Sequence, residues 1–570
     1  MGATTGAQVI VDTLVAEGID TVFGYPGGTV IDLFDALYDA TDKIRVIEPT
    51  HEQHGCHAAD GYARATGKTG VVIATSGPGA TNLVTGIATA YLDSVPLVAI
   101  TGNVSNKMIG TDAFQELDIT GVTLPITKHN YFVRDANRLQ EVLREAFELA
   151  NTGRRGPVLV DVPSDVQKAV VEEGPLTPAP SPSPLRAPEA DLRAAAEAIN
   201  RAKRPFVYFG GGALASGASQ EIIDLARKIG APMGCSLMGI SAIPTDTPGF
   251  LGMEGMHGHY GSTKAMYESD CLIALGARFN DRSTGDRTKY APNGKVVHVD
   301  VDSSEFSKSL EDMVEVRSDV RTFLRDVDQY VEPNTHEDWQ RHVRELRAQE
   351  RGYADYREGL TPKNVMEAIN AVRPEDVPVV TDVGQHQMWA AQFLRFTKPR
   401  TFVTSGGLGT MGFGMGAANG VALATGGPSI LVTGDGSFEM DMAELITAAD
   451  NRIPVIVVLL NNGVLGMVRQ MQSLFKRQRY AMTTLRHRGL DFCAVARGMG
   501  AKATRVSTPE ELGQALEDAL LAQRDEKSAG PRLIEVPIDE DEFVTPVLQI
   551  GASMDELIVN MDDVRSRMGR

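Results

Sequence analysis

Short apolar runs alternate with longer amphipathic segments along most of the 570-residue chain. The runs are rich in Val, Ile and Leu, and such runs between helix-patterned segments are typical of parallel strands covered by helices on both faces. Because the runs form three groups, we expect an α/β protein of three doubly wound parallel-sheet domains. They lie at 21–28, 44–50, 69–79, 95–104 and 156–163, then at 204–212, 231–235, 271–278 and 295–302, and last at 377–384, 400–412, 429–436, 454–462 and 531–539.

Two segments interrupt this alternation and predict the domain boundaries. Residues 174–190 contain six prolines and few apolar residues, which is typical of an extended linker. Residues 332–359 are highly charged and predict a surface helix with a linker. The predicted divisions are a first domain at 1–170, a Pro-rich linker at 171–190, a second domain at 191–331, a linker or helix at 332–360, a third domain at 361–550 and a C-terminal tail at 551–570.

Composition and charge narrow the class of protein. The chain is 42% hydrophobic and 23% charged, as ordinary globular proteins are, and its formal net charge is −19. Such an acidic surface repels phosphate groups, so neither nucleic acid nor a membrane surface is expected as a partner. No stretch has the features of a signal peptide or approaches the ~20 apolar residues of a membrane span. The four cysteines lack metal-ligand spacing, and we expect reduced thiols in a cytoplasmic protein.

Polar side chains end two successive apolar runs of the third group. Asp435 lies between Gly434 and Gly436, and Asn462 follows 27 residues later. This spacing is about one βαβ crossover, so the two strands should be neighbours with their carboxyl ends at one edge of the sheet. Oxygen ligands at that edge suit Mg²⁺, and the glycines would let the backbone approach a diphosphate. A lone Gly-Asp-Gly would indicate only a tight turn, but the pair of motifs favours a magnesium–diphosphate site.

Two further motifs extend this segment to a family resemblance. "GQHQMWAAQ" lies at 384–392 and "TSGGLGTMGFG" at 404–414. With these motifs in order, the chain resembles the catalytic subunits of the acetohydroxyacid synthase (acetolactate synthase) family over nearly its whole length. The resemblance implies the thiamin diphosphate-binding fold, with pyrimidine, central FAD-type and diphosphate domains. It also implies three cofactors, namely thiamin diphosphate, Mg²⁺ and FAD.

The resemblance assigns roles on the diphosphate side. It implies that Asp435, Asn462 and the Val464 carbonyl bind the metal. Met411 is implied to be the apolar wedge that bends thiamin diphosphate into a V shape, whereas outside a glycine-rich loop it would be interpreted as a core methionine. The other residues implied around this cofactor are Pro26, Gly384, Gln385, His386, Gly409, Gly434, Gly436, Ser437 and Phe438.

Glu52 is the candidate for the pyrimidine side. It lies in "PTHEQHGCHAADGYARATG" (49–67), between a predicted strand and a predicted helix. A glutamate there is ordinarily a cap or a partner of the helix dipole. The resemblance instead implies that Glu52 protonates N1′ of the pyrimidine, for which a carboxyl in an apolar pocket is suited by its raised pKa. Because Glu52 and Asp435 fall in different domains, the family implies that they meet across the interface of a homodimer or homotetramer.

The second domain resembles the FAD-binding domain of the family. "YFGGGALASG" (208–217) is a weak dinucleotide motif alone, while "GMHG" (255–258) and "GARFNDR" (276–282) match the family more specifically. Asn280 stands where the family has aspartate, and Ser283 where it has valine. Asp300 ends a predicted strand, a position suited to ribose hydroxyls. The implied FAD residues are Gly210, Gly211, Met256, His257, Gly276, Arg278, Asn280 and Asp300.

The implied reaction decarboxylates pyruvate and adds the hydroxyethyl unit to a second 2-ketoacid. The product would be 2-acetolactate or 2-aceto-2-hydroxybutyrate, as in branched-chain amino acid biosynthesis. Gly28 is implied to offer a backbone amide, and Phe114 and Gln115 to line the entrance. Arg282 is implied to pair with the acceptor carboxylate, although a surface ion pair is the plain alternative. The remaining acceptor-side candidates are Met467, Met471 and Phe475.

Met471 stands where the family usually has the tryptophan that favours 2-ketobutyrate. A flexible methionine defines the pocket less well, and one methylene is worth only ~1–3 kcal/mol at best. Acetolactate formation is therefore our first expectation. A carboligase that uses another acceptor, of an acetoin-type or keto-sugar kind, and a pyruvate oxidase are the alternatives. The family also implies a possible regulatory small subunit as a separate chain.

Overall fold

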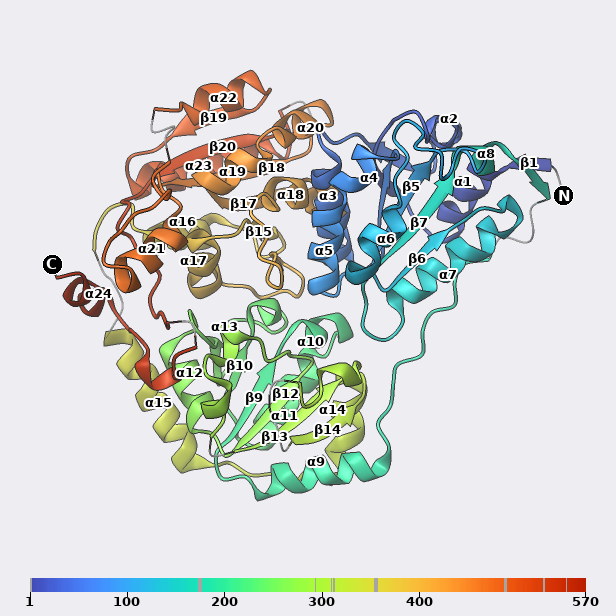
Figure 1. Ribbon diagram of the computed structural model, residues 1–570. Helices are drawn as coiled ribbons and strands as arrows, with labels where there is room; N and C mark the ends of the chain where they lie inside the picture. Colours follow the sequence, from blue (N-terminus) through green and yellow to red (C-terminus); the bar gives the residue numbers. More distant parts are fainter. Residues whose placement is uncertain are drawn as a thin grey trace.

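Three six-stranded parallel sheets form three lobes in the computed structural model of the chain (Figure 1). Helices cover both faces of each sheet, and the N-terminal and C-terminal lobes lie side by side above the middle lobe. The predicted three-part α/β fold is confirmed. The described residues are 3–172, 177–292, 294–308, 310, 313–352, 357–485, 489–525, 528–549 and 551–569.

The N-terminal lobe has the strand order β3-β2-β4-β5-β7-β6. Strands β4, β5 and β7 are buried along their whole length, which explains their unbroken apolar sequence. The strands are β1 (Ala3–Thr5), β2 (Thr21–Tyr25), β3 (Arg45–Ile47), β4 (Gly70–Ala74), β5 (Leu97–Asn103), β6 (His129–Phe132), β7 (Pro157–Pro163) and β8 (Val170–Glu172), and β1 pairs with β8 in a separate antiparallel ribbon. The α-helices are α1 (Gly6–Ala16), α2 (Ile31–Asp39), α3 (Glu52–Thr66), α4 (Pro78–Asn82), α5 (Val84–Leu92), α6 (Ile119–Thr123), α7 (Leu139–Asn151) and α8 (Ser164–Lys168).

The middle lobe has the strand order β11-β10-β9-β12-β13-β14. The described part of the Pro-rich segment that leads to it, residues 177–188, contains no helix or strand. The strands are β9 (Pro205–Phe209), β10 (Met233–Cys235), β11 (Phe250–Met253), β12 (Cys271–Leu275), β13 (Lys295–Asp300) and β14 (Met313–Arg317). The helices are α9 (Glu189–Arg201), α10 (Gly211–Ser216), α11 (Ser219–Lys228), α12 (Tyr260–Glu268), α13 (Asp281–Thr284), α14 (Val320–Val327) and α15 (Glu337–Gly352), and α15 packs against α12.

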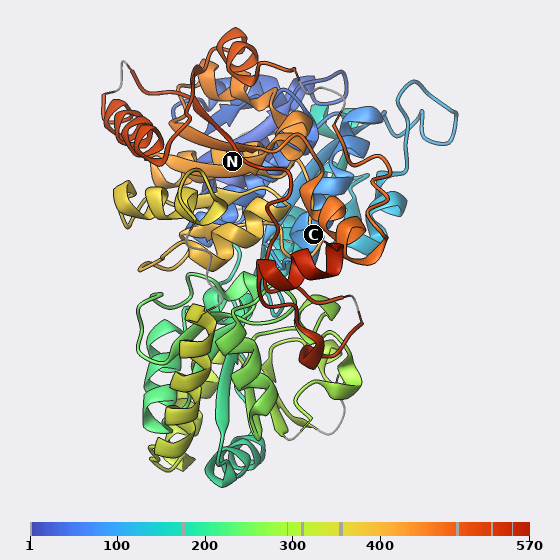
Figure 2. The same cartoon turned by 90° about the vertical axis from the view of Figure 1, so that its left-hand side faces the viewer.

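The C-terminal lobe has the strand order β16-β15-β17-β18-β20-β19. After its sheet, the chain passes between the upper lobes and the middle lobe and ends in α24 (Figure 2). No helix in the described ranges has the length and apolar character to cross a bilayer. The strands are β15 (Val379–Thr381), β16 (Phe402–Val403), β17 (Ser429–Gly434), β18 (Val455–Asn461), β19 (Lys502–Arg505) and β20 (Arg532–Pro537). The helices are α16 (Pro362–Val372), α17 (Gln385–Phe393), α18 (Gly414–Thr425), α19 (Asp435–Asp441), α20 (Glu444–Asp450), α21 (Gly466–Phe475), α22 (Phe492–Gly498), α23 (Pro509–Ala522) and α24 (Met561–Met568).

Helices α3 and α18 join the N-terminal and C-terminal lobes (Figure 1). Their contact is made by small residues, because each helix passes close to the backbone of the other. A Cβ atom on Gly420 would lie 1.9 Å from the Ala58 carbonyl oxygen, and one on Gly61 would lie 2.3 Å from the Ala417 carbonyl oxygen. Glycine at these positions therefore fixes the distance between the two lobes.

Gly420→Ala is expected to lower the melting temperature, because the new methyl group overlaps the Ala58 carbonyl and the helices must separate. Overpacking of this kind costs about 1–3 kcal/mol. Gly427→Ala is the matched control, since a Cβ at Gly427 meets no atom within 4 Å. Differential scanning calorimetry of the two variants tests the prediction. Equal melting temperatures for them would contradict it.

Candidate functional site

Asp435 lies where the sheet edge was predicted to hold a metal. It follows β17, whose neighbour is β18, and its side chain is 2% exposed. Oδ1 accepts the Gly436 amide at 2.9 Å, and Oδ2 accepts the Gly463 amide at 2.7 Å. Burial raises the pKa of Asp435 to about 6. A cation beside this carboxylate would favour its ionised form, which is the form that both amides already support.

Asn462 lies close to Asp435, because Gly463, the residue after Asn462, donates its amide to the Asp435 carboxylate. The Asn462 Oδ1 accepts the Val464 amide at 3.2 Å, and its Nδ2 lies 3.5 Å from the Gln385 Oε1. The structure brings Asp435 and Asn462 to one edge of the sheet, as the spacing predicted, and Val464 and Gln385 lie beside them. The Gln385 Nε2 donates to the Gln470 side chain and to the Glu542 carbonyl, which fixes the start of α17.

The loop of Met411 reaches the same edge. A Cβ on Gly436 would lie 3.9 Å from the Met411 Cε, so the methionine side chain points toward the start of α19. His386 is also buried there, and burial lowers its pKa to about 3. Because its Nε2 has no partner among the described residues, the neutral ring leaves one polar atom at the candidate cofactor site. The Ser437 hydroxyl donates to the Val383 carbonyl at 2.9 Å and ties α19 to the turn before α17.

Glu52 is the first residue of α3, and His51 caps that helix. The Asn82 Nδ2 donates to the Glu52 Oε2 at 2.9 Å. A Cβ on Gly79 would lie 3.2 Å from the Glu52 Oε1, so the glycine leaves room beside the carboxylate. Glu52 is partly exposed in the single chain rather than enclosed in an apolar pocket.

Gln115 lies near the same helix start. A Cβ on Gly77 would approach the Gln115 Cβ to 2.9 Å, so Gln115 packs over the turn that leads to Gly79. The φ of Gln115 is 61°, a conformation uncommon for residues other than glycine. The N-terminal lobe thus assembles Glu52 and Gln115, and the C-terminal lobe assembles Asp435, Asn462 and Met411. No described hydrogen bond or ion pair joins the two sets within the chain.

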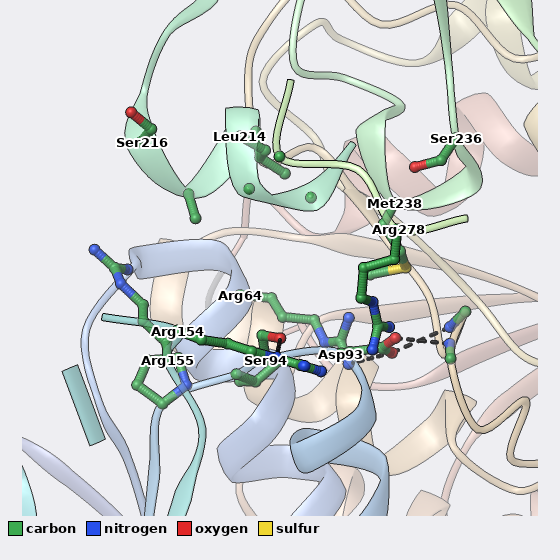
Figure 3. A pocket seen from close by; sticks show the side chains of 18 of the residues that line it. Arg64, Asp93, Ser94, Arg154, Arg155, Leu214, Ser216, Ser236, Met238 and Arg278 are labelled. Atoms are coloured by element: carbon green, nitrogen blue, oxygen red, sulfur yellow. Dashed lines mark hydrogen bonds and ion pairs between the residues drawn. The ribbon is translucent and has the colours of Figure 1, made fainter. Parts of the chain in front are cut away.

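A cavity of about 1710 Å³ lies between the three lobes. Residues from each lobe line it, and Figure 3 shows N-terminal-lobe side chains facing those of the middle lobe across the space. Its volume exceeds the ~300–1,000 Å³ of sites for drug-sized ligands, so a dinucleotide-sized molecule would fit. The lining includes these residues predicted from the sequence: Gly211, Met256, His257, Gly276, Arg278, Asn280, Arg282, Asp300, Gly409, Met467 and Met471.

Arginines that the motifs did not indicate also face this cavity (Figure 3). Arg155 and Arg400, together with the predicted Arg278, form no ion pair with a carboxylate in the described part of the chain. Burial lowers the pKa of each of these three guanidinium groups. Arg154, in contrast, pairs with Glu305 at 2.8 Å. Guanidinium groups that face a cavity without a direct ion-pair partner favour an anionic ligand.

In the wall of the cavity, hydrogen bonds join residues of the N-terminal lobe to residues of the C-terminal lobe. Asp93 accepts the Arg64 guanidinium at 2.9 Å and the Gly406 and Gly407 amides at 3.1 and 2.7 Å, as dashed lines in Figure 3 show. Arg64 also donates to the Thr404 carbonyl at 2.9 Å. The loop before Met411 is therefore held by residues of the N-terminal lobe, a contact that no local sequence pattern reveals.

The candidate binding residues of the middle lobe include a strand end, a helix cap and a tightly packed turn. Asp300 ends β13, and burial raises its pKa to about 6. Asn280 caps α13, because its side chain accepts the Arg282 and Ser283 amides at 3.0 Å each. Gly210 packs on the backbone, since a Cβ there would lie 2.6 Å from the Gly276 carbonyl oxygen. His257 lies 3.2 Å from the Pro546 carbonyl, and burial lowers its pKa to about 4.

The acceptor and entrance candidates, together with the cofactor candidate Pro26, lie in four different places. Arg282 is exposed, lies 3.8 Å from Asp281 and contacts the Met256 sulfur at 3.7 Å. Met471 faces the cavity and also packs, with Phe475, against the cluster that contains α24. Phe114 is 87% exposed. Gly28 and Pro26 are exposed in the turn after β2, so all these roles stay predictions.

Glu254 is a buried acid that the motifs did not indicate. It is 3% exposed, and neither carboxyl oxygen has a hydrogen-bond partner among the described residues. The hydroxyls of Tyr208, Ser283 and Tyr290 and the thiol of Cys235 surround it. Burial raises the pKa of Glu254 to about 8, so the carboxyl is protonated at neutral pH.

Glu254→Gln is expected to be most stabilising, relative to the wild type, at alkaline pH. The unfolded glutamate loses its proton near pH 4.5 and the folded one near pH 8, so the contribution of Glu254 to stability is complete below 4.5 and declines up to 8. Between these pH values the free energy of unfolding of the wild type falls by about 1.4 kcal/mol per pH unit. Glutamine does not ionise, so the variant does not lose stability in this way. Melting temperatures at pH 5 and pH 9 test this. A difference between variant and wild type that does not change with pH would contradict it.

Comparison with known families identifies the class of protein. The chain matches the family models of thiamine pyrophosphate enzymes for the N-terminal TPP binding domain at residues 4–122, the central domain at 192–327 and the C-terminal TPP binding domain at 382–536. Thiamine pyrophosphate is thiamin diphosphate, so the two candidate half-sites fall within the two cofactor-binding domains. The protein is a thiamin diphosphate-dependent enzyme.

Individual relatives narrow this class. The chain is 42% identical to the acetolactate synthase isozyme 2 large subunit of Escherichia coli over 97% of this chain and 99% of that one. It is 43% identical to the acetolactate synthase large subunit of Corynebacterium glutamicum, over 97% of this chain and 90% of that one. It is 40% identical to the probable acetolactate synthase large subunit of Methanocaldococcus jannaschii, over 97% of this chain and 95% of that one. The chain belongs to the family of acetolactate synthase large subunits, and the predicted family and carbon–carbon-forming activity are confirmed.

Proposed function

We propose that the chain forms 2-acetolactate from two molecules of pyruvate, with thiamin diphosphate held through Mg²⁺ at the carboxyl ends of β17 and β18. The observation that carries this proposal is the meeting of Asp435, Asn462 and Val464 at one sheet edge. These residues supply one carboxylate, one amide oxygen and one carbonyl, and hard oxygen ligands of this kind suit Mg²⁺, which then takes further oxygens from a diphosphate. The starts of α17 and α19 add backbone amides for the diphosphate.

Thiamin diphosphate, when bound, supplies the carbanion that attacks the keto carbon and accepts the electrons of decarboxylation. The protein residues orient this chemistry and move protons. Glu52 would donate a proton to N1′ of the pyrimidine, and its hydrogen bond from Asn82 orients the carboxyl for that transfer. Met411 would support the bent cofactor, because its side chain points toward the α19 turn. Gln115 and the Gly28 amide would face the reacting oxygen.

A second copy of the chain would complete each site. The proposal is supported by the lack of a described hydrogen bond or ion pair between Glu52 and Asp435 within the chain, and by apolar side chains on the surface. Met482 is 81% exposed and Met440 is 54% exposed, both near the diphosphate half-site in sequence, and Phe114 is 87% exposed near the other half. A homodimer, or a homotetramer built from it, would cover such residues and bring Glu52 of one protomer to Asp435 of its partner.

FAD is proposed as the ligand of the cavity between the lobes. The residues present fit such a molecule: Arg155, Arg278 and Arg400 would face its diphosphate, and Asp300 would accept hydrogen bonds from ribose hydroxyls. A Cβ on Gly211 would lie 3.3 Å from the Met238 side chain, so a larger residue at this position would crowd that side chain at the wall of the cavity. Because the net reaction transfers no electrons, FAD would act mainly as a structural component.

Arg282 would bind the carboxylate of the acceptor 2-ketoacid. Its exposed guanidinium lies at the cavity that Met467 and Met471 also line. The family relatives are named as large subunits, and we propose that a separate small subunit regulates this chain. The cytoplasmic location expected from the sequence stays a prediction.

Product analysis tests the proposed function. Purified protein would receive thiamin diphosphate, Mg²⁺ and FAD with pyruvate alone and then with equimolar 2-ketobutyrate. Acetolactate is expected as the main product, with little preference for 2-aceto-2-hydroxybutyrate. Met471→Trp is expected to raise the ratio of the mixed product to acetolactate by up to about tenfold, because a rigid ring contacts the extra methyl group and one methylene is worth ~1–3 kcal/mol.

Two outcomes would redirect the proposal. Carbon dioxide release without acetolactate would indicate a carboligase that uses another acceptor. Consumption of oxygen with pyruvate would indicate a pyruvate oxidase. Met471→Leu is the matched control, because it keeps an apolar side chain of similar volume without adding a ring. A strong preference of the wild type for the mixed product would contradict the role assigned to Met471.

A further inference from the structure

We propose that Asp382 is the residue that positions Met411, and that Asp441 supports it as a neutral, protonated acid. The inference rests on the proposed role of Met411 as the support of the bent cofactor. Asp382 follows β15 and is fully buried, and Asp441 ends α19 and is 1% exposed. Neither residue touches the cofactor in the proposed function, so both act through the loop between them.

The Asp382 carboxylate organises the backbone on the C-terminal side of Met411. Oδ1 accepts the Gly412 amide at 3.0 Å, and Oδ2 accepts the Gly414 amide at 3.1 Å. Oδ1 also accepts the Val383 amide at 2.7 Å, in the segment that leads to the diphosphate side. One carboxylate thus couples the Met411 loop to the start of α17. Both of its oxygens are used as acceptors, so the ionised form fits this position.

Asp441 accepts the next amide along the chain. Its Oδ2 lies 2.6 Å from the Met415 nitrogen, directly after the Gly414 amide held by Asp382. Its Oδ1 is buried and has no partner among the described residues. Two buried carboxyls that bind consecutive amides cannot both be ionised at low cost, and the oxygen without an N–H partner is the one suited to carry the proton.

The surroundings favour the same assignment. Burial and the neighbouring Asp382 raise the pKa of Asp441, and Glu444 on α20 acts in the same direction. From α3, His54 lies 3.4 Å from Glu444, and burial lowers the pKa of the neighbouring His57. No ion pair with a Lys, Arg or His is found for Asp382 or Asp441 within the described ranges, whereas His54 pairs with Glu444. A proton is therefore the means by which one of the two charges is removed.

Asparagine substitutions separate the two roles. Asp382→Asn places an NH₂ group against an N–H donor whichever way the amide is oriented, because both oxygens accept. Asp441→Asn keeps one acceptor for the Met415 amide and places the NH₂ where the protonated oxygen was. We expect Asp382→Asn to slow hydrogen–deuterium exchange at C2 of bound thiamin diphosphate by about tenfold or more, and Asp441→Asn to leave it within about threefold.

Three further variants make the test decisive. Met411→Ala should slow C2 exchange; if it does not, the proposed role of Met411 fails independently of Asp382. Gly414→Ala should act like Asp382→Asn, because its Cβ would lie 2.8 Å from the Asp382 Oδ2, and it decides the question if Asp382→Asn does not fold. Asp161→Asn is the control: this buried Asp accepts Asn103 and Thr101 in the other lobe, and its loss should lower stability only.

Infrared spectroscopy locates the proton without any cofactor chemistry. The carbonyl stretch of a protonated carboxylic acid should appear at neutral pH in the difference between the wild type and Asp441→Asn. C2 exchange at the wild-type rate in folded, cofactor-bound Asp382→Asn, when Met411→Ala is slow, would overturn the positioning role. The absence of the protonated-acid band, or equal slowing by both asparagine variants, would overturn the assignment of the proton to Asp441.

Discussion

Glu52→Gln is expected to lower kcat by about 10²–10⁴-fold, the usual contribution of a positioned acid–base group. Glutamine keeps the size of the side chain and can still accept a hydrogen bond from Asn82, but its amide is not an acid and cannot transfer a proton to N1′. Steady-state kinetics and the C2 exchange rate of bound thiamin diphosphate should fall together. The affinity for thiamin diphosphate should change much less, since in the proposed function the diphosphate would be held by the other half-site.

Glu48→Gln is the matched control for this variant. Glu48 is exposed and lies four residues earlier in the same segment, so the substitution removes a similar charge without touching the proposed site. Wild-type kinetics are expected for it. A Glu52→Gln enzyme that keeps its kcat within about threefold would show that the activating proton comes from another group.

Asp435→Asn is expected to weaken the binding of thiamin diphosphate by about 10²–10⁴-fold at saturating Mg²⁺. The physical reason is the loss of a buried charge that would face the ion, and breaking such a pair costs ~3–5 kcal/mol. The remaining Asn462 and Val464 oxygens are neutral. Titration calorimetry measures the affinity. Asp450→Asn, at the exposed carboxyl that ends α20, is the control and is expected to bind within about threefold of the wild type. Equal affinities for both variants would contradict the assignment of Asp435 as a metal ligand.

Mixing the Glu52→Gln and Asp435→Asn variants, at a thiamin diphosphate concentration too low to saturate Asp435→Asn, tests the shared site. A hybrid of Glu52→Gln with Asp435→Asn has one site in which both residues are native and one in which both are changed. Because random exchange makes half of the dimers hybrid, about a quarter of the wild-type activity should return. Sites that lie within one chain would give no recovery.

The strand ends of the C-terminal lobe could be predicted from the sequence because their pattern is local. The unbroken apolar runs before Asp435 and Asn462 are long, buried and parallel, and such strands have their carboxyl ends at one edge of the sheet. The same reasoning located the turn at Gly210–Gly212 and the strand end at Asp300. Where a functional group sits at the end of a regular element, its neighbours follow from the geometry of that element.

The wall of the cavity could not be predicted in this way. Arg155 and Arg400 lie far apart in sequence, and a single arginine at a loop is typical of ordinary surface positions. Asp93 holds Gly406 and Gly407 through contacts that span more than 300 residues. Asp382 precedes a recognised motif, but nothing local indicates that both of its oxygens bind the amides of a distant loop. Such roles depend on how the lobes dock, and sequence periodicity does not encode docking.

The cavity belongs to no single lobe, and this sets an order of events during biosynthesis. The N-terminal lobe leaves the ribosome first, but the space between the lobes forms only when residues 405–409 of the last lobe have docked. A molecule that fills this space can bind only a finished chain. Its uptake would therefore mark the completion of folding, and a chain that never acquires it would keep its linkers open to proteases.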